Sequence, residues 1–133
     1  IVPLEQPAIF NEIALTFLRE KKFFEILGQK GVFEAVQTVQ EAWKGNDNSL
    51  HFGERKLNQT AYSYLGKGRV NDAIEVFKLN VAAYPGSWNA YDSLAEAYLA
   101  DGQNELAIFY YEKSLALNPG NRSAVDQLRS LKK

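Results

Sequence analysis

An internal repeat of 34 residues is the feature that most constrains what this 133-residue chain can fold into. Residues 54–87 align without a gap on residues 88–121. A fixed period of this length is typical of repeat proteins, in which each copy buries its apolar face against its neighbours. The aligned positions share size and chemistry: Tyr64 with Tyr98, Gly68 with Gly102, Ala73 with Ala107, Phe77 with Tyr111, and Pro85 with Pro119.

The residue types at these positions predict two helices in each copy. Gly68 and Gly102 stand where a first helix ends, because glycine tolerates the left-handed backbone that closes a helix C-terminus. Pro85 and Pro119 follow the second helix, which proline cannot continue. Each copy is therefore expected to be a helix–turn–helix unit with antiparallel helices.

Three further sets of positions support this prediction. Ser87 and Asn121 are the expected N-caps of the helices that follow each copy. Small residues are expected where two helices approach closely: Ala61, Ala73, Ala95 and Ala107. Large rings are expected to fill the space between helices: Tyr64, Phe77, Tyr98 and Tyr111.

The second copy resembles the tetratricopeptide repeat, a helix–turn–helix unit of the same length. The first copy departs from the signature at Thr60, where leucine is preferred, and at Asn80, where alanine is preferred. The resemblance implies an all-α fold of about seven helices, a short right-handed superhelix of antiparallel helix pairs. The matching positions are Tyr91, Leu94, Ala95, Tyr98, Gly102, Ala107, Tyr111, Leu115 and Pro119.

Two copies are fewer than the three usually needed for stability, so both ends of the solenoid need cover. The C-terminal residues predict an amphipathic capping helix with one apolar stripe: Ala124, Val125, Leu128 and Leu131. On the N-terminal side, residues 31–44 predict a helix with five inward-facing residues: Val32, Phe33, Val36, Val39 and Trp43. The expected organisation is a helical segment at 1–27, a connecting helix and loop at 28–53, repeats at 54–87 and 88–121, and the capping helix at 122–133.

The first residues of the sequence predict another amphipathic helix, over residues 7–22. Its apolar face is expected to hold Phe10, Ile13, Ala14, Phe17 and Leu18. One interpretation is that this helix folds back on the next and caps the solenoid. Because Ile1 is not a residue before which initiator methionine is normally removed, we also expect the sequence to be part of a longer protein.

The sequence of this segment resembles the last helix of α/β-hydrolases of the esterase and lipase type, over about the first twenty residues. The residues that fit are Pro3, Glu5, Pro7, Phe10, Asn11, Phe17 and Leu18. Residues 31–58 resemble the connector that joins bacterial serine hydrolases to C-terminal tetratricopeptide repeats. The resemblance implies a bacterial parent hydrolase acting on acyl esters, with this chain as its C-terminal part. The compartment stays open between cytoplasmic and extracytoplasmic.

The chain itself carries no recognisable catalytic set. A serine hydrolase needs a nucleophile on a G-x-S-x-G turn, and the sequence has none. His51 is the single histidine, and cysteine is absent, so we expect no catalytic residue, no metal site and no cofactor. His51 is interpreted as a loop or packing residue.

Charge excludes one class of partner and leaves another open. The net charge is −1 with both signs interspersed, which argues against a nucleic-acid surface. No apolar run is long enough for a membrane span. An acidic stretch over residues 88–118 is interpreted either as solvated helix charge or as a surface that faces a partner. Its acidic residues are Asp92, Glu96, Asp101, Glu105 and Glu112.

The tetratricopeptide resemblance implies that the first helix of each repeat lines a concave groove. The groove positions in this chain are Asn58, Tyr62, Leu65, Asn89, Asp92, Glu96 and Leu99. Tyr62 and Leu65 are candidates for an apolar anchor, and Asp92 and Glu96 for contact with a basic group. Some family members clamp a chaperone carboxylate with Lys, Arg and Asn, but here the corresponding residues are Tyr62, Ser93, Ser123 and Gln127.

The leading functional hypothesis is therefore a non-catalytic scaffold module that binds a protein or peptide. The alternative is self-association or docking, with the parent hydrolase domain or a second copy of the chain as partner.

Overall fold

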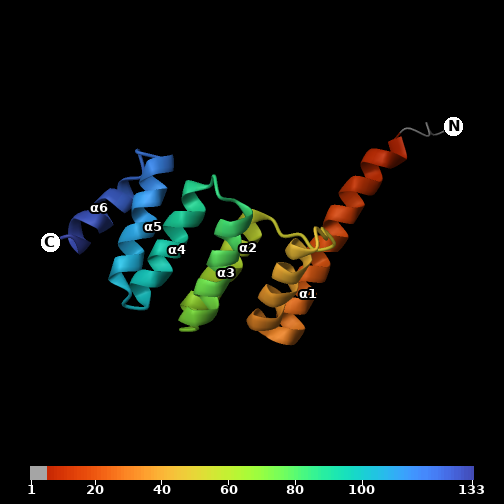
Figure 1. The fold of residues 1–133 in the computed structure, drawn as a ribbon, viewed down its shortest axis with the longest axis horizontal. Helices are drawn as coiled ribbons and strands as arrows, with labels where there is room; N and C mark the ends of the chain where they lie inside the picture. Colours follow the sequence, from red (N-terminus) through yellow and green to blue (C-terminus); the bar gives the residue numbers. More distant parts are fainter. Residues whose placement is uncertain (1–5) are drawn as a thin grey trace. The chain divides into compact units, whose positions relative to one another are not determined.

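The computed structural model describes residues 6–133, with side chains from residue 11, and these residues form six helices and no strand (Figure 1). The helices are α1 (Gln6–Lys44), α2 (Glu54–Gly66), α3 (Val70–Ala83), α4 (Trp88–Ala100), α5 (Asn104–Leu117) and α6 (Arg122–Leu131). The predicted all-α class is confirmed. The expectations for Pro3 and Glu5, and for the side chains of Pro7 and Phe10, lie outside the described part.

The chain divides into two compact units, one ending at Gly53 and the other running from Glu54 to Lys133. In the first unit, α1 breaks at Gly31, whose φ of 90° is not helical. The first arm therefore continues to residue 30, beyond the expected end at residue 22, and the second arm folds back beside it (Figure 1). Phe23 on the first arm is buried, and its ring lies 5.0 Å from that of Phe52 in the segment after α1.

The expectation that Phe33 faces inward is wrong, because its side chain is 72 % exposed. Val32, Val36 and Val39 are buried and follow the i, i+4, i+7 spacing of one helix face. Phe33 lies about 100° around the helix from Val32 and therefore falls off that face. Trp43, also expected to face inward, is 41 % exposed while its ring lies 6.3 Å from that of Phe52.

In the second unit, each helix packs against the next in chain order, and α2 also contacts α4 (Figure 1). The turn within each repeat is closed by a glycine in the left-handed region, as predicted, with φ of 78° at Gly68 and 76° at Gly102. After each glycine the chain hydrogen-bonds back to the first helix, from Arg69 N to Tyr64 O and from Gln103 N to Tyr98 O, both 2.9 Å. These equal bonds show that the two copies turn in the same way.

The predicted N-caps of α4 and α6 are both present. Ser87 Oγ accepts a hydrogen bond from Ala90 N at 3.2 Å, and Asn121 Oδ1 accepts one from Ala124 N at 3.3 Å. Each cap satisfies an N–H that has no partner within its own helix.

Polar and small residues together join the two helices of each copy. The four alanines expected at close approaches are fully buried: Ala61, Ala73, Ala95 and Ala107. Asn80 Nδ2 donates to Glu54 O at 3.3 Å, and its equivalent Ser114 donates from Oγ to Trp88 O at 2.9 Å. Asn80 thus departs from the alanine of the signature and gains a hydrogen bond to the start of α2.

Helix α6 covers α5 with the predicted stripe, in which Ala124 and Leu128 are buried and Val125 and Leu131 half-buried. Lys132 Nζ also lies 2.7 Å from Glu112 Oε1 on α5. Among residues 6–133, no helix combines the length and hydrophobicity that crossing a membrane requires.

Candidate functional site

Helices α2 and α4 occupy equivalent places in the two repeats and contact one another. The repeat therefore pairs their residues in successive levels along the surface that they share. From the helix N-termini these levels are Arg55 with Asn89, Asn58 with Asp92, Tyr62 with Glu96, and Leu65 with Leu99. The chemistry changes from polar, through acidic, to apolar along this α2–α4 groove.

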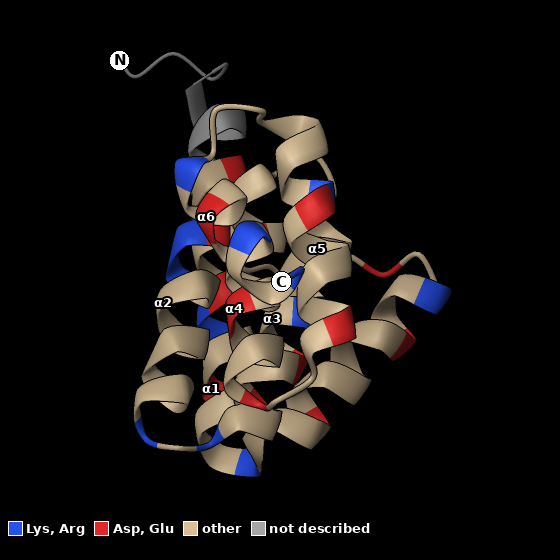
Figure 2. Cartoon of the chain, turned by 90° about the vertical axis from the view of Figure 1, so that its left-hand side faces the viewer, with Lys and Arg blue, Asp and Glu red and all other residues tan. Residues whose placement is uncertain are grey.

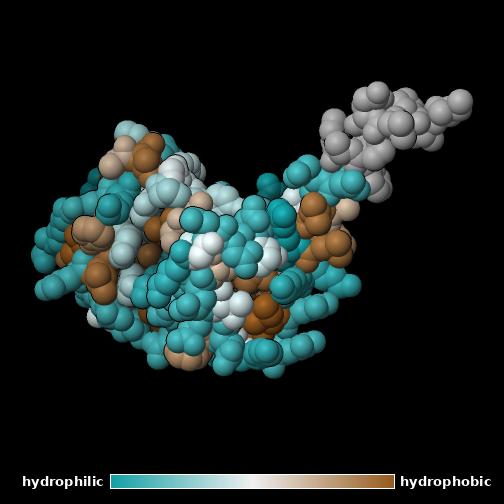
Figure 3. All heavy atoms as spheres, turned by 45° about the vertical axis from the view of Figure 1, so that its right-hand side comes forward, coloured by the Kyte–Doolittle hydropathy of each residue, from teal (hydrophilic) through white to brown (hydrophobic). Residues whose placement is uncertain are grey.

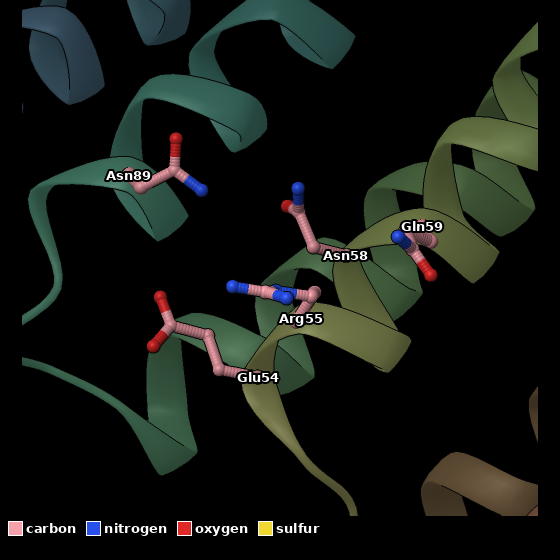
Figure 4. Close-up of a pocket in the computed structure, with 5 residues that line it drawn as sticks. All are labelled: Glu54, Arg55, Asn58, Gln59 and Asn89. Atoms are coloured by element: carbon pink, nitrogen blue, oxygen red, sulfur yellow. The ribbon is translucent and has the colours of Figure 1, made fainter.

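A cavity of about 690 Å³ opens at the N-terminal end of the groove. Five residues line it: Glu54, Arg55, Asn58, Gln59 and Asn89. In Figure 4 the amides of Asn58 and Asn89 project toward one another from α2 and α4. Asn58 Oδ1 is buried without a hydrogen-bond partner, so the site contains an acceptor that no described donor satisfies.

One level further, Tyr62 links the two helices. Its hydroxyl donates to Glu96 Oε2 at 2.6 Å and lies 3.1 Å from Ser93 Oγ. Burial is the main reason that the pKa of Tyr62 is raised, and the hydrogen bond to Glu96 raises it further. The phenol therefore stays protonated and keeps donating to the carboxylate at neutral pH.

Asp92 on α4 is half-buried beside Asn121, the N-cap of α6. Its Oδ1 accepts from Asn121 Nδ2 at 2.8 Å, so the cap of α6 also holds this carboxylate. Burial raises the pKa of Asp92; the bond from Asn121 lowers it, and the charge of Glu96 raises it. Burial likewise raises the pKa of Tyr111, and the negative charges of Asp92 and Glu96 raise it further.

The structure thus brings four of the seven predicted groove residues into two groups. Asn58 and Asn89 share the cavity, and Tyr62 bonds to Glu96. Leu65 and Leu99 are half-buried, and the remaining residue is the half-buried Asp92 described above.

Sequence reasoning missed Arg55, Glu54 and Gln59, which line the cavity. The signal for Arg55 was present, because it aligns with Asn89, which was predicted. Ser93 was not among the predicted groove residues, and its Oγ lies 3.1 Å from the Tyr62 hydroxyl. In the described part of the chain, no three His, Cys, Asp or Glu side chains gather as a metal ion would require.

Two comparisons with known proteins bear on the fold. Residues 88–121 match the family model of the tetratricopeptide repeat, the same residues as the second copy of the internal pattern. The fold is that of a tetratricopeptide solenoid. Among solved structures, the first TPR of Spaghetti (RPAP3) bound to the HSP90 peptide SRMEEVD is similar, with a TM-score of 0.60 at 21% sequence identity. The similarity covers 90% of this chain and 91% of that one. No curated protein sequence matches.

Proposed function

We propose that this chain is a protein-interaction module whose α2–α4 groove binds an extended segment of a partner protein. The observation that carries the proposal is the cavity of about 690 Å³ at the start of the groove, lined by side-chain amides and the Arg55 guanidinium. Amides both donate and accept, so Asn58, Gln59 and Asn89 suit the backbone of a peptide that lies between α2 and α4. The similar Spaghetti domain supports the proposal, because its structure contains a bound peptide.

The ligand is not expected to copy the HSP90 peptide of that domain. At the positions where some family members carry a cationic clamp, this chain has Tyr62, Ser93, Ser123 and Gln127. None of these side chains is a cation, and Tyr62 already donates to the carboxylate of Glu96. The proposed partner is therefore a protein segment other than an acidic C-terminal tail.

A peptide-array screen with the full chain, repeated with groove variants, tests the proposal. Tyr62→Ala and Asp92→Lys are each expected to weaken the binding of the captured peptides by about tenfold or more, as substitution of centrally placed interface residues does. Phe109→Ala and Glu105→Lys change exposed residues of α5 and are the matched controls. An array without binding, or peptides held equally by the groove variants, would contradict the proposal.

Self-association is a second candidate function, favoured by the exposed apolar face of the first arm of α1. Ile13 and Phe17, one turn apart, are each 66 % exposed, and Leu18 is 56 % exposed. Figure 3 shows hydrophobic atoms exposed on this arm directly beside the grey N-terminal residues. A contiguous apolar face of this kind is typical of surfaces that bind a second protein. We propose a second copy of the chain as its partner, and a parent hydrolase domain as the alternative.

Light scattering over a concentration series tests this second candidate. Wild type is expected to dimerise with rising concentration, and Ile13→Glu with Phe17→Glu to remain monomeric. Phe33→Glu changes an equally exposed ring on the second arm of α1 and is the control. A wild-type monomer at every concentration would exclude the second copy as partner.

The relation to a serine hydrolase is a further proposal that rests on the resemblance of the first twenty residues. Its test is the coding sequence of the complete gene. We expect a G-x-S-x-G motif, then an aspartate, and then a histidine shortly before Ile1. A different domain at that place, or a start codon immediately before Ile1, would refute the relation.

A further inference from the structure

We infer that the acidic part of the α2–α4 groove, formed by Asp92 and Glu96, binds a lysine or arginine side chain of the partner segment. This inference rests on the proposed function and specifies its ligand. It requires three properties of the groove: negative charge without an internal counter-ion, carboxylate oxygens that remain free to accept hydrogen bonds, and a position for the cation that is separate from Arg55.

The groove carboxylates have no cationic partner in the described part of the chain. Asp92 and Glu96 lie one turn apart on α4, and no Lys, Arg or His forms an ion pair with either. Red positions lie by the α4 label in Figure 2, and the sequence of this helix holds no Lys, Arg or His. Elsewhere in the same unit, acidic side chains pair with cations across one turn: Asp72 with Arg69, Glu75 with Lys78, and Asp126 with Arg129. Among residues 11–133, no cationic side chain therefore offsets the repulsion between these two like charges on successive turns.

This acidic part of the groove also has more hydrogen-bond acceptors than the chain supplies donors for. Asn58 Oδ1 is buried and accepts no bond. Glu96 uses one carboxylate oxygen for the Tyr62 hydroxyl, and Asp92 uses one for Asn121. Ammonium and guanidinium groups carry only donors, so they complement this set of acceptors, whereas a carboxylate would add acceptors and negative charge.

The arrangement along the groove determines where the cation binds. Arg55 lines the cavity together with Glu54, so a cation and an anion already offset one another there. Tyr62 on α2 donates to Glu96 through the 2.6 Å bond, and its ring lies edge-on to that of Phe77 with 5.0 Å between the ring centres. Leu65 and Leu99 follow at the next level and offer apolar contact for the methylene stem of a long side chain. A basic side chain accordingly lies between the cavity and the leucines.

The test measures binding of three labelled nonapeptides to the full chain by fluorescence anisotropy. One peptide alternates arginine with alanine, and the other two have glutamine or glutamate in place of arginine. The arginine peptide is expected to bind about tenfold more tightly than the glutamine peptide, since two partly exposed ion pairs contribute about threefold each. The glutamate peptide is expected to bind most weakly.

The variants change charge while keeping shape. In the double variant Asp92→Asn with Glu96→Gln, the affinity for the arginine peptide is expected to fall to within about twofold of the affinity for the glutamine peptide. Glu105→Gln removes an exposed acidic charge from the first turn of α5 and is expected to leave the tenfold preference intact. Far-ultraviolet circular dichroism checks that each variant remains folded.

The outcomes separate this inference from the proposed function. Equal binding of the arginine and glutamine peptides, or an arginine preference that survives the double variant, overturns the inference. If the arginine and glutamine peptides bind equally and Tyr62→Ala abolishes the binding of both, the groove is an interaction site without selection for basic residues. If no peptide binds wild type, both proposals fail.

Discussion

Single residues at the ends of the repeats connect local backbone geometry to the groove. Ser87 caps α4 through Ala90 N, and its hydroxyl also donates to Glu54 at the start of α2. Asn121 caps α6 through Ala124 N and donates to Asp92. Each cap therefore fixes a helix end and an acidic groove side chain at once, so a change at either position affects both stability and the site.

The left-handed turn glycine gives a prediction at this scale. Gly68→Ala is expected to lower the free energy of unfolding by about 1 kcal/mol, because its φ of 78° is unfavourable for any residue with a Cβ. Gly66→Ala, two residues earlier at the end of α2, meets no neighbour and is expected to be neutral or to stabilise by up to about 1 kcal/mol. Urea unfolding measures both, and equal effects would contradict the conformational explanation.

Asp92 gives a prediction for pH. Because burial raises its pKa in the folded chain, the ionised carboxylate disfavours folding at neutral pH, and this cost disappears as pH falls through the raised pKa toward 3.8. Asp92→Asn is therefore expected to be more stable than wild type at pH 7, and this advantage is expected to shrink as the pH falls toward 3.8. Urea unfolding at pH 7 and at pH 3.5 measures the difference. A variant that is less stable than wild type at pH 7 would show that the bond from Asn121 outweighs burial.

At the scale of the element, the second helices of the two repeats differ in their outer faces. The outward positions Asp72 and Glu75 on α3 correspond to Leu106 and Phe109 on α5, which are 39 % and 49 % exposed. Helix α5 is apolar on several sides, so its sequence pattern alone does not show which face packs against α4 and α6. Leu106 and Phe109 stay exposed although α6 packs on α5.

The capping role of α6 gives the prediction for this scale. Leu128→Ala is expected to lower the free energy of unfolding by about 2–3 kcal/mol, because Leu128 is buried on α6, the helix that packs on α5. Leu117→Ala removes an apolar side chain of the same size that is 46 % exposed, and should cost less than about 1 kcal/mol. The midpoint of urea unfolding distinguishes the two. Equal costs would mean that α6 does not complete the core.

These elements also show what a sequence can predict. Gly68, Gly102, Ser87 and Asn121 were predicted because their roles depend on local backbone geometry. The bond between Tyr62 and Glu96 was not, since it depends on the spacing of helices from different repeats. Phe33 was placed wrongly because its size suggested burial, whereas the valine face of its helix was already complete without it.

At the scale of the whole molecule, residues 54–133 form a compact unit with its own core. Leu57, Phe77, Leu94 and Tyr111 are all buried in it. We expect this unit, expressed alone, to be helical by circular dichroism and to unfold in one cooperative urea transition. A gradual loss of signal without a transition would show that the two repeats and α6 need further residues to fold.

The central claim is that the partner segment binds on α2 and α4. Amide chemical-shift mapping tests it most directly, with an isotope-labelled full chain titrated with a peptide captured on the array. The expected result is that shifts gather at Asn58, Tyr62, Asp92 and Glu96. Shifts that gather instead on the outer face of α5, at Leu106 and Phe109, or on the first arm of α1, would contradict it.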